Sequence, residues 1–374
     1  MAPLNRLLSI IPYPLFPTTS AGRKSILQFN NNLSEKISVS AVNVKYGTQP
    51  KVSFNLIQLF DNSRSRYLST SYVSAIKQII RSLQVDFLLI EHPYMAWMGV
   101  ALKRSTGIKW GIRSHNIEYA RFRDFGKWWW PVLKRYEHYV YSKADAVFFI
   151  TEDDKKYAQI DGKLKHAFVM PTGMAIGALP VDSDTCRNYL RQTHGLQPDE
   201  KILIYNGALD YKPNREALNA VLNEINPRLE KIKDFKYKLL ICGSGLDASY
   251  NNLEAYKDHN IIYAGFVDDI TTYFKGADVY LNPVIGGGGI KTRLVEAIAY
   301  NTNVVSTRNG SIGFNKDTVE EKLIVVDDND WGGFTTAVVD MCGRAKRNTT
   351  KEFYDYYYWD NITTRLIQQV NSIS

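Results

Sequence analysis

A run of four glycines between two predicted strands places the tightest constraint on how this chain folds. An apolar strand ends at Pro283, Gly286–Gly289 follow, a helix opens near Ile290, and a second strand covers residues 303–306. Glycine loops bring bare backbone N–H groups close to a ligand, and the dipole of the following helix adds partial positive charge. This unit predicts a site for an anionic group such as a phosphate. The alternative is a glycine-rich surface turn without a ligand.

Strands and helices alternate along the whole chain, which predicts the α/β class with doubly wound parallel sheets. Phe87–Ile90 is apolar throughout, as is typical of a central parallel strand. Asn214 is the expected N-cap of a helix that follows the strand 201–205. The remaining strands are expected at 7–11, 37–44, 54–59, 109–113, 146–150, 237–242, 261–263, 277–283 and 323–326, and helices at 72–83, 95–103, 132–142 and 359–370.

A length of 374 residues favours two domains. Met170–Gly173 punctuates the chain and residues 174–200 show no strong strand, so we expect the interdomain linker there. Two α/β halves of similar size result, and the cleft between them is the expected site.

The composition is that of a soluble globular protein, with 45% hydrophobic and 22% charged residues. No apolar run reaches the ~18 residues that a membrane-spanning helix requires. The apolar stretch at residues 6–12 lacks a small-residue cleavage site, so we expect a first buried strand there instead of a signal peptide. Three scattered cysteines, Cys186, Cys242 and Cys342, suit a reducing cytoplasm and indicate neither a disulfide framework nor a zinc site.

Positive charge is concentrated in the first half of the chain. Residues 1–175 hold 24 Lys and Arg against 12 Asp and Glu, a net +12, whereas the remainder holds 22 against 26, a net −4. An acidic substrate, an anionic membrane surface or nucleic acid would explain this excess, and ordinary solvated charge is the alternative. Trp128–Trp130 lie among basic residues, a mixture that suits a membrane interface, unless the tryptophans pack into the domain. These basic residues are Arg121, Arg123, Lys127, Lys134 and Arg135.

Three glycine turns of the second half follow predicted strands: Gly207, Gly243 with Gly245, and Gly286–Gly289. Ligands bind at the carboxyl ends of strands in such sheets, so these turns are expected to converge on one crevice. Two known glycine signatures are excluded. Gly243-Ser244-Gly245 lacks the third glycine of the dinucleotide fingerprint, and Ile290 separates the last loop glycine from Lys291-Thr292, which breaks the phosphate loop of nucleoside triphosphatases.

Charged residues around these turns suggest a chemistry. Lys291 and Arg293 at the helix start, and Lys212 beyond Gly207, can stabilise a leaving diphosphate. Glu296 can accept hydrogen bonds from a ribose diol. The alternatives are surface positions for all four, with Arg293 paired to Glu296 three residues on.

Two histidines follow predicted strands of the first half. His115 lies in a polar, basic setting and is the stronger candidate for a site residue. His92 precedes Pro93, which favours a simple turn.

The chain resembles glycosyltransferase family 4, a retaining family, over nearly its whole length. The segments that carry the resemblance are Pro12–Gly22, Ser114–Glu118, Ala144–Val147, Met170–Gly173, Asn206–Asn214, Gly243–Gly245, Gly265–Val267 and, most strongly, 277–307. The resemblance implies the GT-B fold, with two facing Rossmann-like domains and a C-terminal helix that crosses back to the first domain. It places the acceptor in residues 1–175 plus the helix 356–374, and the nucleotide sugar in residues 176–355.

The resemblance also implies roles for individual residues. Glu296 corresponds to the second of two family glutamates and would hold the nucleotide ribose, while the glycine loop would hold the diphosphate. His115, Lys212 and Lys291 are the expected catalytic residues, with His115 contacting the transferred sugar. The expected donor-binding residues are Gly22, Gly207, Lys212, Gly243, Gly287, Gly288, Gly289, Ile290, Lys291, Thr292 and Glu296.

Two positions depart from the family. Gly288 replaces the first glutamate, which removes a frequent contact to the donor sugar and leaves the donor open. Ala208-Leu209 stands where many members carry an arginine, and Lys291 is expected to compensate.

The sequence therefore predicts a cytoplasmic retaining glycosyltransferase without a metal or other cofactor, peripheral to the inner membrane face. It would move a sugar from a nucleotide-diphosphate sugar to a glycan or lipid-linked acceptor in cell-surface polysaccharide or glycoconjugate synthesis. The alternatives are a GT-B-fold sugar-nucleotide epimerase and a non-catalytic nucleotide-sugar-binding protein. No nucleic-acid recognition motif is present, so a nucleic-acid partner is not expected.

Overall fold

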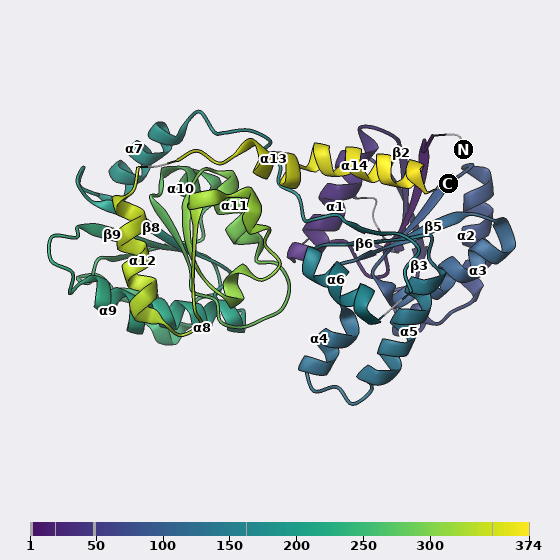
Figure 1. Ribbon diagram of the computed structural model, residues 1–374, viewed down its shortest axis with the longest axis horizontal. Helices are drawn as coiled ribbons and strands as arrows, with labels where there is room; N and C mark the ends of the chain where they lie inside the picture. The colour runs from purple at the N-terminus through teal and green to yellow at the C-terminus, as the bar shows by residue number, and fades with distance from the viewer. Residues whose placement is uncertain (1–2, 19, 48–49, 162, 346, 374) are drawn as a thin grey trace. The chain divides into compact units, whose positions relative to one another are not determined.

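Two parallel β-sheets, one in each half of the chain, organise the structure (Figure 1). This computed structural model describes residues 3–18, 20–47, 50–161, 163–345 and 347–373. Its contacts divide the chain into unit 1, formed by Met1–Ala175 and Tyr356–Ser374, and unit 2, formed by Ile176–Asp355. The parallel sheets with interleaved helices confirm the predicted α/β class.

The described strands of unit 1 form a parallel sheet in the order β3-β2-β1-β4-β5-β6-β7. Following the chain, β1 to β3 extend the sheet on one side, and β4 to β7 extend it on the other. The point at which the strand order reverses, the switch point, therefore lies between β1 and β4. The strands are β1 (Arg6–Ile10), β2 (Ser38–Val44), β3 (Asn55–Phe60), β4 (Phe87–Glu91), β5 (Lys109–Ser114), β6 (Ala146–Phe149) and β7 (Ala167–Val169). The helices are α1 (Ala21–Ser34), α2 (Ser71–Ser82), α3 (Trp97–Thr106), α4 (Glu118–Asp124), α5 (Trp130–Lys143), α6 (Glu152–Asp161) and α14 (Trp359–Ser372).

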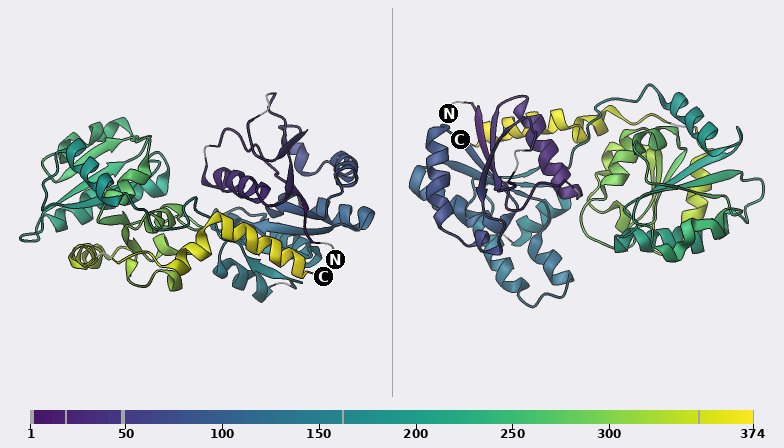
Figure 2. Two further views of the ribbon diagram at one scale, coloured as in Figure 1. Left: turned by 90° about the horizontal axis from the view of Figure 1, so that it is seen from above. Right: turned by 180° about the vertical axis from the view of Figure 1, so that it is seen from behind.

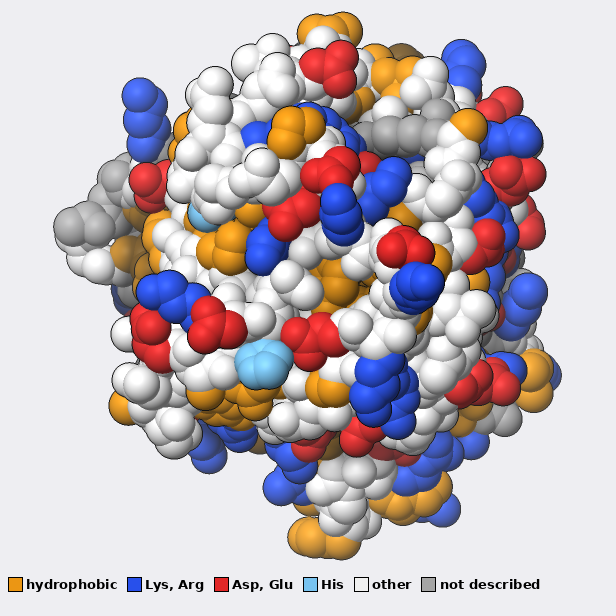
Figure 3. All heavy atoms as spheres, turned by 90° about the vertical axis from the view of Figure 1, so that its left-hand side faces the viewer, with side chains coloured by type: hydrophobic (Ala, Val, Ile, Leu, Met, Phe, Trp, Pro, Cys, Tyr) orange, Lys and Arg blue, Asp and Glu red, His pale blue; other side chains and the backbone are white. Residues whose placement is uncertain are grey.

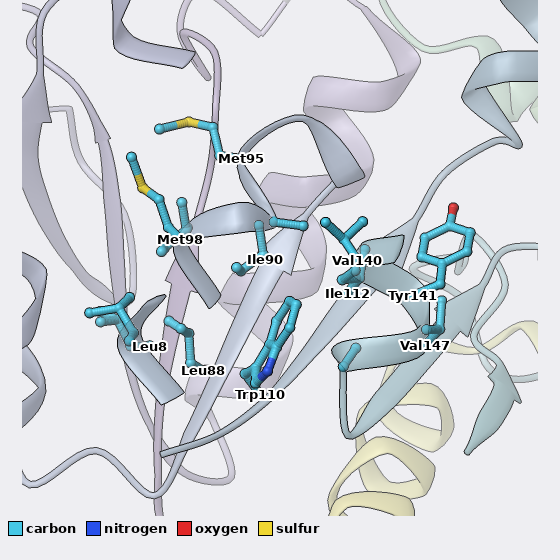
Figure 4. Packing of buried hydrophobic residues seen from close by; sticks show 14 of the residues in the cluster. Leu8, Leu88, Ile90, Met95, Met98, Trp110, Ile112, Val140, Tyr141 and Val147 are labelled. Carbon is cyan, nitrogen blue, oxygen red and sulfur yellow. The ribbon is translucent and has the colours of Figure 1, made fainter. Parts of the chain in front are cut away.

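Alternate residues of these strands enter different cores, because successive side chains point to opposite faces of a sheet. Leu8 and Leu88 pack on the face covered by α2, α3 and α5, together with Trp110 (Figure 4). Leu7 and Leu89 pack on the other face, beneath α1 and α14. Both faces are buried, which explains why β4 is a continuous apolar run up to its final glutamate.

The final helix α14 belongs to unit 1 and lies beside α1 (Figures 1 and 2). Trp359 at its start is 1% exposed, and a Cβ atom at Gly173 would lie 2.3 Å from the Trp359 ring, so only glycine fits there. Near its end, the Asn371 side chain accepts a hydrogen bond from the Leu4 N–H at 2.8 Å. These contacts tie the last helix to the first strand region, as the resemblance implied.

The described strands of unit 2 form a second parallel sheet in the order β10-β9-β8-β11-β12-β13. Its strand order reverses between β8 and β11, which is the switch point of unit 2. The strands are β8 (Lys201–Asn206), β9 (Tyr237–Cys242), β10 (Ile261–Gly265), β11 (Val279–Asn282), β12 (Asn303–Thr307) and β13 (Leu323–Val326). The helices are α7 (Ser183–His194), α8 (Lys212–Ala220), α9 (Asn226–Leu229), α10 (Ile270–Gly276), α11 (Thr292–Ala299), α12 (Trp331–Gly343) and α13 (Lys351–Tyr357), which crosses the boundary between the units.

Unit 2 carries charges of both signs, in keeping with its nearly balanced sequence. Figure 3 shows the face on the side of unit 2, where basic and acidic side chains are interspersed. No helix among the described residues is both long enough and apolar enough to cross a bilayer.

Three local predictions need correction. The helix after β8 begins at Lys212 with Tyr211 as its N-cap, so Asn214 lies inside the helix and its amide instead donates to the carbonyl oxygen of Ala208 at 3.0 Å. The expected linker contains the helix α7, whose Leu190 is buried in unit 2. Residues 331–343, for which no element was expected, form the buried helix α12.

Candidate functional site

The switch point of unit 2 brings two of the predicted glycine turns to neighbouring strand ends. β8 ends at Asn206 and β11 ends at Asn282, and these two strands pair in parallel. Connections that leave toward opposite sides of a sheet favour a ligand site at the carboxyl ends of the two strands. Asn206 is 6% exposed, and its side-chain oxygen has no hydrogen-bond partner among the described residues.

The turns after β8, β9 and β10 are held together through their backbones. The Gly207 N–H donates to Cys242 at 3.2 Å, and the Gly243 N–H donates to Gly265 at 2.7 Å. A Cβ atom at Gly243 would lie 2.0 Å from the carbonyl oxygen of Gly207, and φ is +151° there. Any side chain would therefore force these two turns apart.

The glycine loop after β11 lies against the start of α8. A Cβ atom at Gly287 would lie 3.4 Å from Cγ of Pro213, and one at Gly286 would lie 3.7 Å from a carboxylate oxygen of Glu216. Gly287 and Gly289 have φ values of +80° and +74°, a region that favours glycine. Exposed backbone at residues 287 and 288 leaves the loop open to a ligand.

Lys291 closes the loop as the N-cap of α11. Its Nζ donates to the carbonyl oxygens of Gly287 at 2.7 Å and Gly289 at 3.1 Å, and no carboxylate of the described chain pairs with it. Burial lowers the pKa of Lys291 to about 8. Thr292 begins the helix, whose first turn contains no acidic residue. The helix start thus combines a desolvated cation with free backbone N–H groups, the arrangement that binds anions.

Two further predicted residues flank this cation. Glu296 is partly buried one turn into α11 and forms an ion pair with Arg293, so the surface pairing considered for Arg293 is present. The Lys212 side chain is 77% exposed, with its Nζ 3.7 Å from Glu216. Gly22 lies in unit 1, in the first turn of α1, where a Cβ atom would stand 3.9 Å from the Tyr13 hydroxyl.

A second polar cluster lies at the carboxyl edge of the unit 1 sheet. His115 follows β5, and its Nε2 lies 2.6 Å from Glu91, the last residue of β4. Arg113 approaches the same carboxylate at 3.4 Å and donates to Ser25. Glu91 and Arg113 are fully buried. Burial would raise the pKa of Glu91, but Arg113 and His115 outweigh it and hold this pKa below its usual value.

His92 lies in the turn after β4, as predicted, and it also belongs to this cluster, which was not predicted. Its ring stacks on that of His115 with centroids 4.2 Å apart. Its Nε2 lies 2.9 Å from the Tyr13 hydroxyl and its Nδ1 lies 3.2 Å from Glu118. His92 also holds a φ of +63°, a strained value for a residue with a side chain. Sequence reasoning missed it because the pairing of β4 with β5 creates the contact.

The tryptophan cluster divides between core and surface. Trp130 packs against the unit 1 core, and Trp129 lies against Phe122 with ring centroids 4.6 Å apart. Trp128 is 86% exposed at the connection between α4 and α5, and Phe125 of the same connection is 60% exposed. The alternative of packing into the domain therefore holds for Trp129 and Trp130, whereas Trp128 is exposed.

No group of His, Cys, Asp or Glu side chains in the described part of the chain could hold a metal ion.

Comparisons with known proteins identify this architecture. A family model described as Glycosyltransferase Family 4 matches residues 48–174, and one described as Glycosyl transferases group 1 matches residues 200–343. The chain therefore carries a glycosyltransferase family 4 domain followed by a glycosyl transferases group 1 domain.

One curated relative of this glycosyltransferase comes from Methanocaldococcus jannaschii and bears the name of an uncharacterized glycosyltransferase. It is 30% identical over 195 residues, which are 47% of this chain and 46% of the relative. The chain thus matches about half the length of that curated relative.

Solved structures share the whole fold. A sucrose-phosphate synthase from Thermosynechococcus elongatus is 16% identical over 99% of both chains, with a TM-score of 0.72. A glycosyltransferase from Rickettsia africae is 13% identical over 99% of this chain and 98% of its own, with a TM-score of 0.73. The Anabaena protein HepE in complex with UDP is 11% identical over 99% of this chain and 100% of its own, with a TM-score of 0.71. These likenesses identify the fold of this glycosyltransferase as GT-B.

The close approach of Gly243 to Gly207 predicts different costs for two glycine substitutions. Gly243→Ala is expected to destabilise unit 2 by about 2 kcal/mol or more, because φ is positive and the new methyl group meets the Gly207 carbonyl. Gly288→Ala is the matched control, since its φ is not positive and a Cβ atom there meets nothing within 4 Å. Differential scanning calorimetry would compare the two, and equal melting temperatures would contradict the prediction.

Proposed function

We propose that the chain is a retaining glycosyltransferase that moves a sugar from a nucleotide-diphosphate sugar to a glycan or lipid-linked acceptor, in cell-surface polysaccharide or glycoconjugate synthesis. The observation that carries the proposal is the open glycine loop at the switch point of unit 2, with Lys291 unpaired by any described carboxylate at the helix start. Family membership supports sugar transfer. The Anabaena protein HepE was solved with UDP and with UDP-glucose, which supports a nucleotide sugar as the donor.

In this proposal Lys291 and the backbone amides at the start of α11 stabilise the leaving diphosphate. Negative charge develops on the diphosphate as its bond to the sugar breaks, and preorganised donors in a desolvated site are worth most at that moment. Lys291 exchanges the carbonyl oxygens of Gly287 and Gly289 for phosphate oxygens, and Lys212 supplies a second, more exposed cation. Protein groups thus provide the positive charge, and the proposal includes no metal or other cofactor.

Glu296 binds the ribose in the same proposal. Its partly buried carboxylate lies one turn beyond Lys291 and is oriented by Arg293, so one oxygen remains available to a hydroxyl pair. Gly207, Gly243 and Gly287–Gly289, followed by Ile290 and Thr292, provide close backbone approach, and Gly22 does so at the first turn of α1. Unit 1 binds the acceptor, and His115 contacts the transferred sugar.

Two alternative functions predict different reaction products or none. A GT-B-fold epimerase would convert the sugar nucleotide without an added acceptor. The second alternative is a binding protein that has lost transfer, which the glycine at position 288 in place of the family glutamate suggests. Such a protein would show no hydrolysis of the donor, not even slow hydrolysis. Product analysis with and without acceptor separates all three.

Removal of the Glu296 carboxylate tests nucleotide binding. Once a thermal-shift screen has identified the preferred nucleoside diphosphate, Glu296→Ala is expected to weaken its binding about 10- to 100-fold in calorimetry, because hydrogen bonds to a charged group are lost. Arg293→Ala is expected to cost less, since the carboxylate remains. Glu254→Ala removes an exposed helical glutamate and should change nothing. Unchanged affinity in Glu296→Ala would reject the ribose role.

The lowered pKa of Lys291 predicts the pH dependence of transfer. Above pH about 8 the free enzyme loses the ammonium proton, so kcat/KM should fall about tenfold for each further pH unit. Lys291→Arg should abolish this fall because a guanidinium stays charged. Lys291→Ala should lower kcat far more than donor affinity, since the cation acts mainly on the departing diphosphate. A wild-type profile that stays flat to pH 9.5 would contradict the assignment.

We further propose that unit 1 contacts an anionic membrane surface through the connection between α4 and α5, as a peripheral protein of the cytoplasmic face. The exposed side chains of Phe125, Trp128 and Val132 provide apolar contacts there. Residues 121–135 contain five basic residues and one acidic residue, Asp124, which complements anionic headgroups. A lipid-linked acceptor would lie at the same surface.

Liposome flotation tests the membrane contact. Wild-type protein should float with anionic vesicles at low salt, less at high salt because charges are screened, and not with neutral vesicles. Trp128→Ala should weaken binding about tenfold through the loss of one inserted aromatic side chain. Tyr189→Ala, which removes an exposed aromatic side chain of unit 2, is the control and should bind normally. No flotation of wild type with anionic vesicles would refute the contact.

A further inference from the structure

The hydrogen bonds of His115 determine which of its ring nitrogens carries the proton. Its Nε2 lies 2.6 Å from a carboxylate oxygen of Glu91, which is fully buried beside the Arg113 guanidinium. A buried glutamate paired with arginine remains ionised and can only accept hydrogen bonds. Nε2 of His115 must therefore be the donor, and the proton resides there.

His92 has the opposite arrangement. Its Nδ1 faces Glu118, which is ionised because His92 and the nearby Arg121 outweigh the effect of burial and lower its pKa to about 2. Its Nε2 lies 2.9 Å from the Tyr13 hydroxyl, so both nitrogens of the His92 ring have a polar partner.

Each carboxylate beside the two rings already faces an arginine. Glu91 faces Arg113 and Glu118 faces Arg121, while Tyr13 and Tyr94 contribute only neutral hydroxyl groups. A proton added to His115 would lie on a ring stacked 4.2 Å from His92 and largely shielded from water. Burial, with His92 beside it, lowers the pKa of His115 to about 3.

This leaves Nδ1 of His115 as a bare acceptor, because the hydrogen bond that the ring makes to a described residue uses Nε2. We propose that His115 meets its substrate as a neutral imidazole whose Nδ1 accepts a hydrogen bond from a sugar hydroxyl, and that Glu91 is the positioning residue that fixes this tautomer. The identity of the hydroxyl as that of a sugar rests on the proposed function. His115 then neither donates a proton nor supplies a cation to the diphosphate.

The tautomer itself is measured without turnover. Long-range ¹H–¹⁵N correlation spectra distinguish protonated from bare ring nitrogens, and a His115→Asn spectrum assigns the signals among the six histidines. We expect His115 to show a protonated Nε2 and a bare Nδ1, unchanged from pH 5 to pH 8. An imidazolium, or a proton on Nδ1, would overturn the proposal.

Two carboxylate variants test the role of Glu91. Glu91→Gln should mix the tautomers of His115, because an amide both donates and accepts. Glu118→Gln should perturb the signals of His92 and leave those of His115 in place. A His115 spectrum that Glu91→Gln leaves unchanged would remove Glu91 as the positioning residue.

A pair of His115 variants tests the acceptor role even if the Glu91 variant fails to fold. Asparagine can place an oxygen near the position of Nδ1, whereas glutamine places its amide near that of Nε2. His115→Asn should therefore keep at least about tenfold more kcat/KM than His115→Gln, the value of one hydrogen bond. Equal activity, or more activity in the glutamine variant, would overturn the proposal. A wild-type protein without transferase activity would instead reject the proposed function, and the spectra would still decide the tautomer.

Discussion

The reversal of strand order at β8 and β11 is the constraint on which the candidate site of unit 2 depends. Parallel strands need crossover connections. At the switch point, the connections from two neighbouring strands run to opposite faces of the sheet. Backbone can therefore lie at the sheet edge without a helix above it. Glycines at 207 and 243 let the neighbouring turns approach each other to backbone contact. The loop before α11 lies at the same point, and Lys291 donates hydrogen bonds to two carbonyl groups of its tight turns.

Unit 1 has the same topology, but buried charged groups lie at the carboxyl edge of its sheet. Its sheet ends in Glu91, His92, Arg113 and His115, polar groups at the ends of strands that are apolar on both faces. A buried carboxylate is tolerated only with a partner, and Arg113 also packs over the ring of Phe29 at 4.5 Å. The charged pair lies where α1 and α14 meet the sheet, so the cluster that orients His115 is anchored in the packed core.

Sequence patterns predicted the fold well because hydrophobic periodicity reports burial directly. The strands Tyr237–Cys242 and Leu323–Val326 have the predicted bounds, and the glycine turns lie at strand ends as expected. The N-cap prediction for Asn214 was wrong because two hydrogen-bonding roles compete for its side chain. The amide donates to the Ala208 carbonyl oxygen in the turn instead of capping the helix. The missed role of His92 has a different cause, the pairing of strands in three dimensions. His92 stacks on His115, which follows β5, only because β4 and β5 pair in the sheet. No pattern in the sequence around His92 indicates that contact. The roles assigned to Lys291, Glu296 and His115 remain predictions.

The return of α14 to unit 1 has a consequence for biosynthesis. Residues 176–355 leave the ribosome before Trp359, Ile362 and Leu366, so the core beneath α1 stays incomplete until α14 has been made. Unit 2 is continuous in sequence and has all its strands by then. The nascent chain therefore passes through a stage in which the later-made unit is complete, while the earlier one still exposes Phe29 and Leu33. In a growing chain, that apolar surface is where a chaperone would bind.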